Sequence, residues 1–423
     1  MIATDVLKES ILETNFTCIP IETTKLSSIE NPKIIIDSPI KVEPSSLFGK
    51  PYTTYQIKVE ELNSNVRRRF SDFDWLYQIL SHLFVGNIIP KLEKKYIGDR
   101  FSEEFLQSRI EDMTLFLQFI LNDSLLKSAQ IIFDFLTVED YNDFTQKKNT
   151  YDKIKKPSNL LQIKSVAGEE KSIVNNDSEQ FVLKIKFNSD VMINHYNNIC
   201  EKFELITEEM KNISNHMNDI SNIFSQISKN EFFFPKKMCD CYNNLENHMK
   251  NWSQLIQNQR ELINIMNNSF KFFSRENSAI KEFHSKVELQ KANYYKGEEK
   301  LKIRKQSLFD KGDPMKWELK LDKPINFVQL KENKEIAFIK MIPKETENVY
   351  QSKLIYGFYN YRIINQYNLI KDYFTKCNLE LFNNYFSKQK NFLETFNNDI
   401  LNNISFLDNN EIQEKKPTDA TIH

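Results

Sequence analysis

A hydrophobic repeat between residues 199 and 227 constrains this chain more than any other feature. Its apolar side chains alternate steps of four and three residues without a break, which gives a period of 3.5. They are Ile199, Phe203, Ile206, Met210, Ile213, Met217, Ile220, Phe224 and Ile227. This period is typical of a helix packed lengthwise against other helices. We therefore expect these side chains to form a helical core rather than a cofactor site.

Two further long helices are predicted downstream. Residues 230–235 interrupt the repeat, because Pro235 ends one helix or opens the next. A second apolar stripe runs from Met238 to Val287, and a third helix is expected from near Pro343. The second helix is predicted to be the longest of the three. A helix of about seventy residues is roughly 100 Å long and cannot hide its stripe within a compact monomer, so we expect a dimer.

The N-terminal part of the chain has a different pattern. Three β-branched or aromatic runs, at 34–36, 52–59 and 66–70, are separated by turn-forming residues and predict strands. Apolar residues at helical spacing follow from Ser71 and from Ser102. Three strands followed by helices predict a small α+β domain.

These patterns divide the chain into five segments. We expect a flexible tail over residues 1–27, the α+β domain over 28–143 and a linker over 144–188, followed by the helical domain over 189–410 and a tail over 411–423. The linker is basic, and its apolar residues near 160–166 are compatible with a short amphipathic helix. An ordinary connector is the favoured interpretation of that stretch over a membrane-inserting one.

Composition excludes several classes of function. With 57 basic and 58 acidic residues, no overall positive field attracts nucleic acid, so an anionic partner must meet a local basic cluster. The five cysteines are scattered and include no second pair for a zinc site, so no metal is expected. The sequence shows no apolar run of membrane-spanning length and no secretory signal, which predicts a cytoplasmic protein. A phosphate-binding glycine loop and a nucleophile elbow are also missing after residue 143, so we expect no enzyme and no cofactor.

The densest charge cluster of the α+β domain is Arg67-Arg68-Arg69, followed by Phe70. Side chains alternate along a strand, so Arg67 and Arg69 should face one side and Arg68 the other. An arginine fork binds phosphate oxygens in a bidentate way, and an aromatic ring can stack against a sugar-like ligand. Taken alone, the triplet is better explained as solvated arginines that protect an edge strand.

The residues around the triplet change this interpretation. Residues 67–76 (RRRFSDFDWL) resemble the signature of the PX (phox-homology) domain. Residues 88–94 (IIPKLEK) resemble the proline loop of that family, and 100–109 (RFSEEFLQSR) resemble its next helix. Residues 133–137 (FDFLT) are similar to its closing helix. Four motifs in the family order are specific, and they imply a PX fold with a three-stranded antiparallel sheet.

The resemblance implies a role for individual residues. Arg69 matches the arginine that grips the 3-phosphate of phosphatidylinositol 3-phosphate, and Phe70 matches the aromatic residue under the inositol ring. Lys94 matches the lysine at the 1-phosphate, with Lys95 as the alternative, and Arg109 matches the arginine that hydrogen-bonds the ring hydroxyls. Two departures from the family pattern occur in these motifs. Ile89 and Leu92 replace prolines of the loop, and position 70 is more often tyrosine.

A PX domain followed by a three-helix coiled coil resembles the sorting nexins of the PX-BAR type, with short cues toward the sorting nexin-4 and sorting nexin-7 branch. BAR domains imply an antiparallel helical dimer that presses a concave basic surface on curved membrane. Residues 286–305 carry seven basic and three acidic side chains. A solvated helix face and a membrane-contact patch are equally good interpretations of this stretch. The patch candidates are Lys296, Lys300, Lys302, Arg304 and Lys305.

The resemblance therefore implies a peripheral protein of early or recycling endosomes that binds phosphatidylinositol 3-phosphate and anionic membranes. It would act as a homodimer, or as a heterodimer with another sorting nexin, and sense or induce curvature during sorting of protein cargo, with coat components as further partners. The alternative is a straight coiled-coil tether or cargo scaffold with a PX targeting domain. Sequence period does not separate the two, because curvature arises from kinks and packing angles.

Overall fold

The computed structural model describes residues 24–30, 32–43, 51–93, 101–154, 176–309 and 343–414. The chain forms two compact units. The first contains residues 1–193 and 274–373, and the second contains residues 194–273 and 374–423. Lys94, Lys95 and the expected amphipathic helix near residues 160–166 lie outside the described residues.

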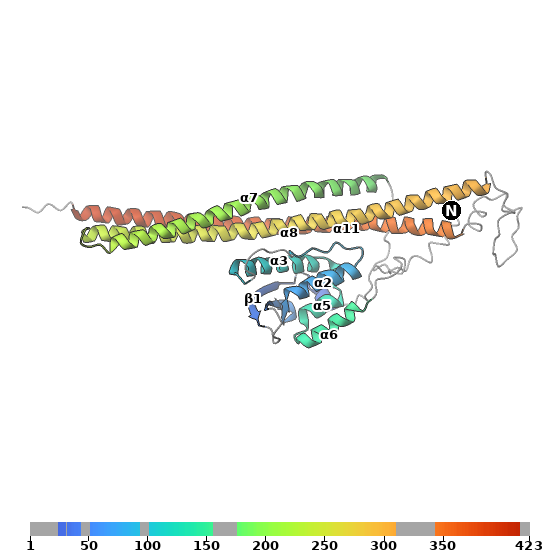
Figure 1. Cartoon of the computed structure of the whole chain (residues 1–423), viewed down its shortest axis with the longest axis horizontal. Coiled ribbons are helices and arrows are strands. Elements are labelled where there is room, and N and C mark those ends of the chain that lie inside the picture. Colours follow the sequence, from blue (N-terminus) through green and yellow to red (C-terminus); the bar gives the residue numbers. More distant parts are fainter. Residues whose placement is uncertain are drawn as a thin grey trace, which may run out of the picture. The chain divides into compact units, whose positions relative to one another are not determined.

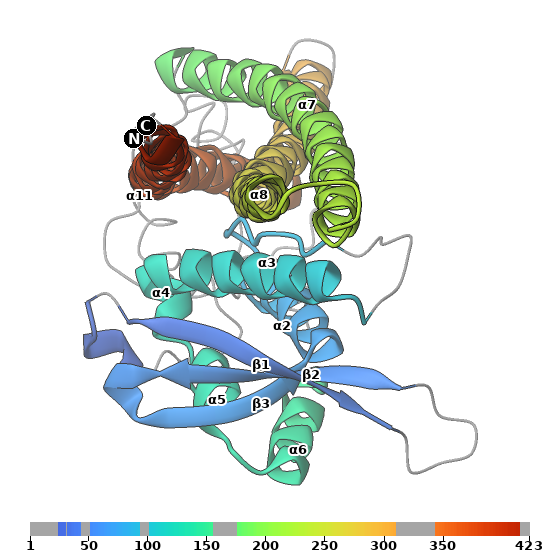
Figure 2. The same ribbon diagram turned by 90° about the vertical axis from the view of Figure 1, so that its left-hand side faces the viewer.

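A three-stranded antiparallel sheet organises the N-terminal part of the first unit (Figure 2). Its strands are β1 (Ile34–Val42), β2 (Tyr52–Val59) and β3 (Ser64–Arg69), with β2 in the centre. Ile57 of β2 pairs with Ile36 of β1 and with Val66 of β3, and all three side chains are buried. The alternation of strand side chains thus gives the sheet one apolar face. The prediction of a three-stranded sheet is confirmed.

Short helices complete this domain. A 3₁₀ turn, η1 (Lys25–Ser28), precedes the sheet, and a second, η2 (Glu60–Leu62), connects β2 to β3. The helices that follow are α2 (Phe70–Leu83), α3 (Glu103–Asn122), α4 (Ser124–Lys127), α5 (Gln130–Thr137) and α6 (Tyr141–Asp152). Phe73 of α2 is fully buried and makes edge-to-face contacts with Phe116 of α3 and Phe135 of α5. These aromatic rings form the centre of the core.

Helix α6 extends over residues that the sequence assigned to the linker. Phe144 and Tyr151 are buried in the same core, and Trp75 Nε1 donates a hydrogen bond of 2.8 Å to Asp152 Oδ1. Lys148 pairs with the buried carboxylate of Asp72 at 2.9 Å. The basic stretch is therefore folded over these residues, because two of its aromatic side chains fill the core and one lysine neutralises an internal charge.

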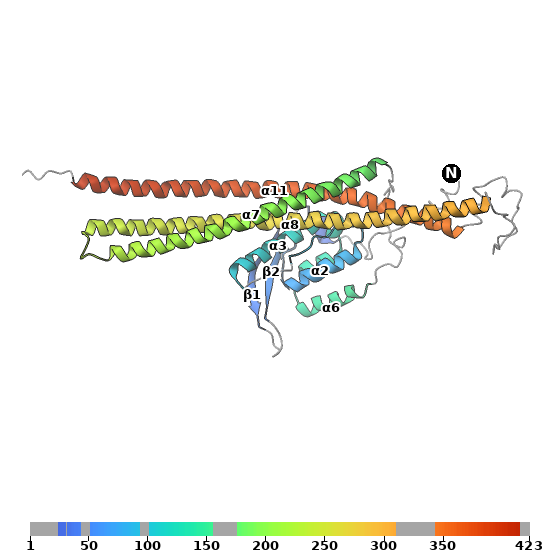
Figure 3. The ribbon, with the colours of Figure 1, turned by 45° about the horizontal axis from the view of Figure 1, so that its top comes forward.

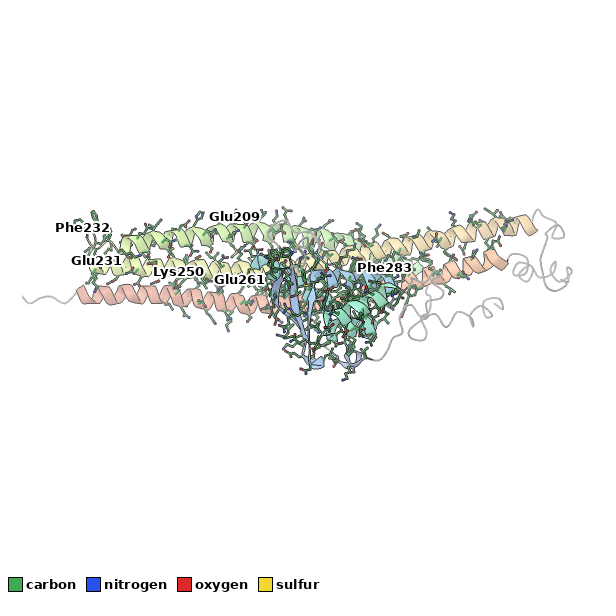
Figure 4. All side chains as sticks on the ribbon, turned by 60° about the horizontal axis from the view of Figure 1, so that its bottom comes forward. Glu209, Glu231, Phe232, Lys250, Glu261 and Phe283 are labelled. Atoms are coloured by element: carbon green, nitrogen blue, oxygen red, sulfur yellow. The ribbon has the colours of Figure 1, made fainter. Side chains whose placement is uncertain are left out.

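Three long helices follow, as predicted. They are α7 (Asn176–Ser228, 53 residues), α8 (Lys236–Phe309, 74 residues) and α11 (Pro343–Glu414, 72 residues), so the second is the longest. Within the second unit their segments run lengthwise beside one another (Figures 1 and 3). Figure 4 places Phe232 at the turn between α7 and α8, where its side chain is 92% exposed. Among the residues that the structure describes, no helix combines the length and apolarity needed to cross a membrane.

A row of small residues brings α7 against α8. Every seventh residue of α7 from 200 to 228 is buried: Cys200, Thr207, Ser214, Ser221 and Ser228. The hydroxyl groups of Ser214 and Ser253 lie 2.8 Å apart, and each is also within hydrogen-bond distance of the other residue's carbonyl, at 3.2 and 3.0 Å. Ser221 donates to the carbonyl of Glu246 at 3.1 Å. Small side chains allow the two backbones to approach closely enough for these contacts.

The predicted apolar repeat of α7 is consequently divided between two environments. Phe203, Met210 and Met217 are partly buried, whereas Ile206 and Ile213 are each 44% exposed. Within a single chain the repeat is therefore only partly buried, and the expectation that a dimer covers the rest stays a prediction. The row of small residues occupies the contact with α8, so the isoleucines next to it stay at the surface.

Candidate functional site

A pocket of about 420 Å³ opens where β2, the end of β3, α2 and α3 meet. It is lined by Pro51, Tyr52, Thr53, Tyr55, Arg69, Phe70, Ser71, Phe101, Phe105 and Arg109. Two arginines and several aromatic rings therefore converge on one cavity. Pockets of this size hold small ligands in proteins.

Arg69 enters the pocket because it ends β3 and directly precedes α2. Its backbone N–H donates to Asp72 Oδ2 at 3.0 Å, and this contact closes the first turn of the helix. The guanidinium carbon lies 5.4 Å from the centre of the Tyr52 ring and 5.8 Å from that of Tyr141. The Nε atom is buried and has no hydrogen-bond partner among the described residues. The side chain is 42% exposed, so its charge is oriented by aromatic rings and still reachable from solvent.

Arg109 comes from the second turn of α3 and forms the opposite wall. Its guanidinium carbon lies 4.0 Å from the centre of the Phe70 ring and 5.1 Å from that of Phe105. Nη1 donates a hydrogen bond to the carbonyl of Glu93. Burial lowers the pKa of Arg109, and the neighbouring carboxylate of Asp112 opposes this shift. Arg109 therefore holds a buried positive charge at the pocket, fixed by two rings and a carbonyl.

The structure thus brings three of the predicted site residues, Arg69, Phe70 and Arg109, to one pocket. Both candidate lysines, Lys94 and Lys95, lie outside the described residues. Glu93, which directly precedes Lys94, is the residue whose carbonyl Arg109 binds.

The three consecutive arginines have three different environments. Arg67 donates to the carbonyls of Ser38 on β1 and Thr54 on β2, at 2.7 and 2.8 Å. Arg68 points to the opposite face and is fully buried, as the strand alternation predicts. It donates to the carbonyls of Phe135 and Val138 and lies 3.8 Å from the Phe144 ring centre. Arg68 is therefore a core residue, and the interpretation of the triplet as three solvated arginines is wrong.

Sequence reasoning missed the aromatic residues that surround the two arginines. Tyr52 begins β2, Phe105 lies on α3 and Tyr141 begins α6. Tyr141 also donates to the buried carboxylate of Asp72 at 3.2 Å, which links α6 to the turn after Arg69. Their aromatic character was visible in the sequence, but their proximity depends on strand register and helix packing.

The proposed membrane-contact patch lies at the C-terminal end of α8. Lys296, Lys300, Lys302 and Arg304 are exposed there. Arg304 Nε lies 3.9 Å from Glu345 Oε1, a weak surface pair. The side chain of Lys305 lies outside the described residues. No group of three or more potential ligand residues in the described parts of the chain is arranged to hold a metal ion.

Comparison with other proteins gives consistent results. The profile of the PX domain family matches residues 58–139. Sorting nexin-4 of Eremothecium gossypii is 27% identical over 42% of this chain and 46% of its own length. Sorting nexin-4 of Candida albicans is 26% identical over 51% of this chain and 32% of its own length. Sorting nexin-30 of Homo sapiens is 32% identical over 26% of this chain and 27% of its own length. The chain therefore matches less than half of the length of these curated relatives.

Solved structures extend the comparison over most of the chain. The SNX-BAR protein Mvp1, determined by cryo-EM as a tetramer, aligns with a TM-score of 0.61 over 88% of this chain and 99% of its own. At 18% identity this likeness shows the fold: a PX domain followed by BAR-type helices. The PX match over residues 58–139, the sorting nexin relatives and the shared fold together support a sorting nexin of the PX-BAR type.

Proposed function

We propose that this chain binds phosphatidylinositol 3-phosphate through the pocket of Arg69, Phe70 and Arg109. The observation that carries the proposal is the convergence of two arginines and an aromatic ring on one cavity of about 420 Å³. Arg69 would grip the 3-phosphate, Phe70 would support the inositol ring and Arg109 would hydrogen-bond its hydroxyls. Lys94, or Lys95 in its place, would meet the 1-phosphate from the adjoining loop.

The chemistry of the pocket favours a phosphorylated sugar-like ring. A guanidinium donates two parallel hydrogen bonds to a phosphate, and these are stronger than neutral hydrogen bonds. The Tyr52 and Tyr141 rings restrict the Arg69 side chain, so less rotational entropy is lost when the ligand binds. The exposed ring of Tyr52 and that of Phe101 form the rim of the pocket, where they are suited to the interfacial layer of a membrane.

Vesicle flotation tests this assignment. The chain should float with vesicles that contain phosphatidylinositol 3-phosphate, and Arg69→Ala should abolish flotation. Arg67→Ala is the matched control, because it removes the same charge from the same strand. The wild-type Arg67 side chain binds backbone carbonyls and does not line the pocket. Equal flotation of Arg69→Ala and the wild type would overturn the site. A panel of singly and multiply phosphorylated phosphoinositides would then define the headgroup preference.

We further propose that the helical part dimerises through the apolar surface of the second unit. Fifteen of the 25 strongly exposed large apolar residues among those described belong to this unit. On α7 they include Ile199, Ile206, Ile213 and Ile220, and on α11 they include Leu379, Phe386, Leu393 and Leu401. Isoleucine at every seventh position forms a continuous apolar stripe. Such stripes are covered by another helix in stable proteins.

The dimer would press the basic end of α8 on anionic membrane and sense or induce curvature, in endosomal sorting and recycling. A straight tether or cargo scaffold remains the second candidate function. Small-angle scattering of the purified dimer and tubulation of large vesicles separate the two. A curved particle that tubulates vesicles supports the first function, and a straight particle that binds without tubulation supports the second.

Sorting nexins of the PX-BAR type are non-enzymatic adaptors associated peripherally with endosomal membranes. We extend both properties to this chain, with early or recycling endosomes as its location. The wild-type chain fused to a fluorescent protein should mark such endosomes, and the Arg69→Ala fusion should be diffuse. A punctate Arg69→Ala fusion would show that the pocket does not direct the protein to membranes.

A further inference from the structure

The loop from Gly86 to Glu93, which leads from α2 to the candidate phosphate-binding lysines, is held from outside the PX domain. At its start, Arg362 of α11 donates to the carbonyl of Gly86 at 3.0 Å and to Asn87 Oδ1 at 2.8 Å. The next N–H, of Ile88, donates to Gln366 Oε1 at 3.0 Å. These contacts lie within the first unit of the chain.

Arg275 of α8 holds the other end of the loop. Its Nε donates to the carbonyl of Lys91 at 2.9 Å, and its Nη1 lies 3.5 Å from Glu93 Oε2. Its Nη2 donates to the carboxylate of Asp112 on α3. Lys91 also forms an ion pair with Glu282, about two helical turns further along α8 than Arg275. One arginine of the helical region thus contacts the loop twice and the PX helix α3 once.

Asp112 connects Arg275 to the pocket. It is 93% buried, and its Oδ2 accepts a 2.9 Å hydrogen bond from the N–H of Glu93. Burial raises the pKa of Asp112, while Arg275 and, more weakly, Arg109 lower it. Two arginines therefore favour the charged form of this buried carboxylate: Arg275 on α8 through direct contact, and Arg109 in the pocket more weakly. Removing either arginine takes away a positive charge that offsets the cost of burying the negative charge of Asp112.

The two arginines also bracket the same short backbone segment. Arg275 binds the carbonyl of Lys91, Arg109 binds the carbonyl of Glu93, and Asp112 binds the N–H of Glu93. Lys94 follows immediately in the chain. The position of this segment decides where the guanidinium of Arg109 is presented to the pocket. Ligand-binding groups need such supporting contacts to be held in a productive geometry.

We propose that Arg275 is a positioning residue for the phosphoinositide headgroup, so that a residue of the BAR-type helices completes the PX site. It acts through Asp112 and the backbone of Lys91 and does not touch the ligand. This inference rests on the proposed function. It makes headgroup affinity a property of the PX domain and α8 together, and it predicts that changes on α8 alter binding at a pocket that they do not line.

The test measures binding of a soluble short-chain phosphatidylinositol 3-phosphate by the full-length chain with isothermal titration calorimetry. A soluble ligand excludes avidity and contacts of the basic patch with a membrane surface. Arg275→Ala should weaken binding about tenfold, a coupling in the middle of the range for contacting residues. Lys281→Ala is the matched control, since it removes one positive charge from the same helix and pairs with Asp190 instead of the loop. Its affinity should stay within about twofold of wild type.

A double-mutant cycle separates positioning from loss of folding. Asp112→Asn alone should weaken binding, and the double variant Arg275→Ala with Asp112→Asn should lose no more than the stronger single variant. Additive losses would overturn the inference. Arg275→Lys keeps the positive charge but loses the planar guanidinium, and it should retain part of the headgroup affinity. Partial binding by this variant would show that the loss in Arg275→Ala does not come from misfolding alone.

The outcomes distinguish the inference from the proposed function. If Arg275→Ala binds as tightly as wild type while Arg69→Ala does not bind, the site assignment stands and the inference is wrong. If the wild-type chain fails to bind the soluble lipid, the proposed function is overturned, and the inference is overturned with it.

Discussion

The guanidinium of Arg109 stacks on the ring of Phe70, with 4.0 Å between the guanidinium carbon and the ring centre. The two residues are 39 positions apart in the sequence and lie on different helices. The family resemblance implies that Arg109 and Phe70 each contact the ligand. The structure shows that the two side chains also contact each other. The ring fixes the plane of the guanidinium, and the guanidinium covers part of the ring.

Replacement of Phe70 should therefore weaken binding by two routes. Phe70→Ala removes the surface under the inositol ring and releases Arg109, and we expect a loss of at least tenfold in affinity. Phe70→Tyr keeps the ring and should bind within about twofold of wild type, because stacking does not require the hydroxyl. Calorimetry with the soluble lipid measures both. Comparable affinity of all three proteins would show that the stack does not contribute.

Arg68 should be required for stability and not for headgroup contact. Its replacement by alanine leaves the carbonyls of Phe135 and Val138 without their donors and removes the stack on Phe144. We expect a loss of about 3 kcal/mol or more in the free energy of unfolding of the PX domain. Urea unfolding followed by tryptophan fluorescence, in a chain whose other two tryptophans are replaced by phenylalanine, reports on this region, because the Trp75 ring packs on Phe144. Arg67→Ala, which alters a half-buried residue, should cost less, and equal losses would contradict the assignment.

Glu276 should make stability depend on pH. Its side chain is fully buried on α8, and neither oxygen has a hydrogen-bond partner among the described residues. Burial raises the pKa of Glu276 to about 8. The positive charge of Arg275 lowers this pKa, and the negative charge of Asp112 on α3 raises it. The folded pKa is thus above the unfolded value of 4.5, and stability falls as pH rises from about 4.5 to about 8.

The variant Glu276→Gln removes this dependence. It should unfold like wild type near pH 4.5 and be more stable near pH 7, by roughly 3 kcal/mol. Thermal unfolding at a series of pH values gives the difference in the free energy of unfolding between the two proteins. The contributions of the other titrating groups cancel in this difference, because both proteins contain them. A difference that does not grow between pH 4.5 and 8 would contradict the burial of an unpaired carboxyl group.

The exposed isoleucines of α7 should determine the oligomeric state. Ile206→Asp combined with Ile213→Asp places two charges in the uncovered stripe, and we expect the dimer to dissociate at micromolar concentration. Sedimentation equilibrium measures the mass. Leu289→Asp is the control, because Leu289 is 58% exposed on α8 but belongs to the first unit. A dimer that persists in the double variant would exclude this face of α7 as the interface.

Charge reversal at the end of α8 should weaken membrane binding without altering the PX pocket. Lys300→Glu with Lys302→Glu changes the local charge by four units, and at about 1 kcal/mol per charge we expect at least a tenfold loss on anionic vesicles. Affinity for the soluble lipid should be unchanged. Lys388→Glu with Lys390→Glu makes the same change on exposed positions of α11 and should have a smaller effect. Equal effects of both pairs would indicate general attraction rather than a patch.

The sequence by itself determined the three strands, the three long helices and three residues of the pocket, Arg69, Phe70 and Arg109. The 3.5-residue period predicted long helices because a buried stripe must recur at the helical repeat, and strand alternation correctly separated Arg68 from Arg67 and Arg69. Each of the four PX motifs is also a short run of neighbouring residues. Each of these features depends on residues close together in the chain.

Only the tertiary structure decided which distant residues meet. Helix α7 packs on α8 through its small residues, and Ile206 and Ile213 therefore stay at the surface. The apolar period alone does not predict which of these two faces of α7 contacts α8. The contact of Arg275 with Asp112 joins positions 163 residues apart. Such contacts depend on strand register, helix rotation and packing between elements, and no local pattern in a single sequence encodes them.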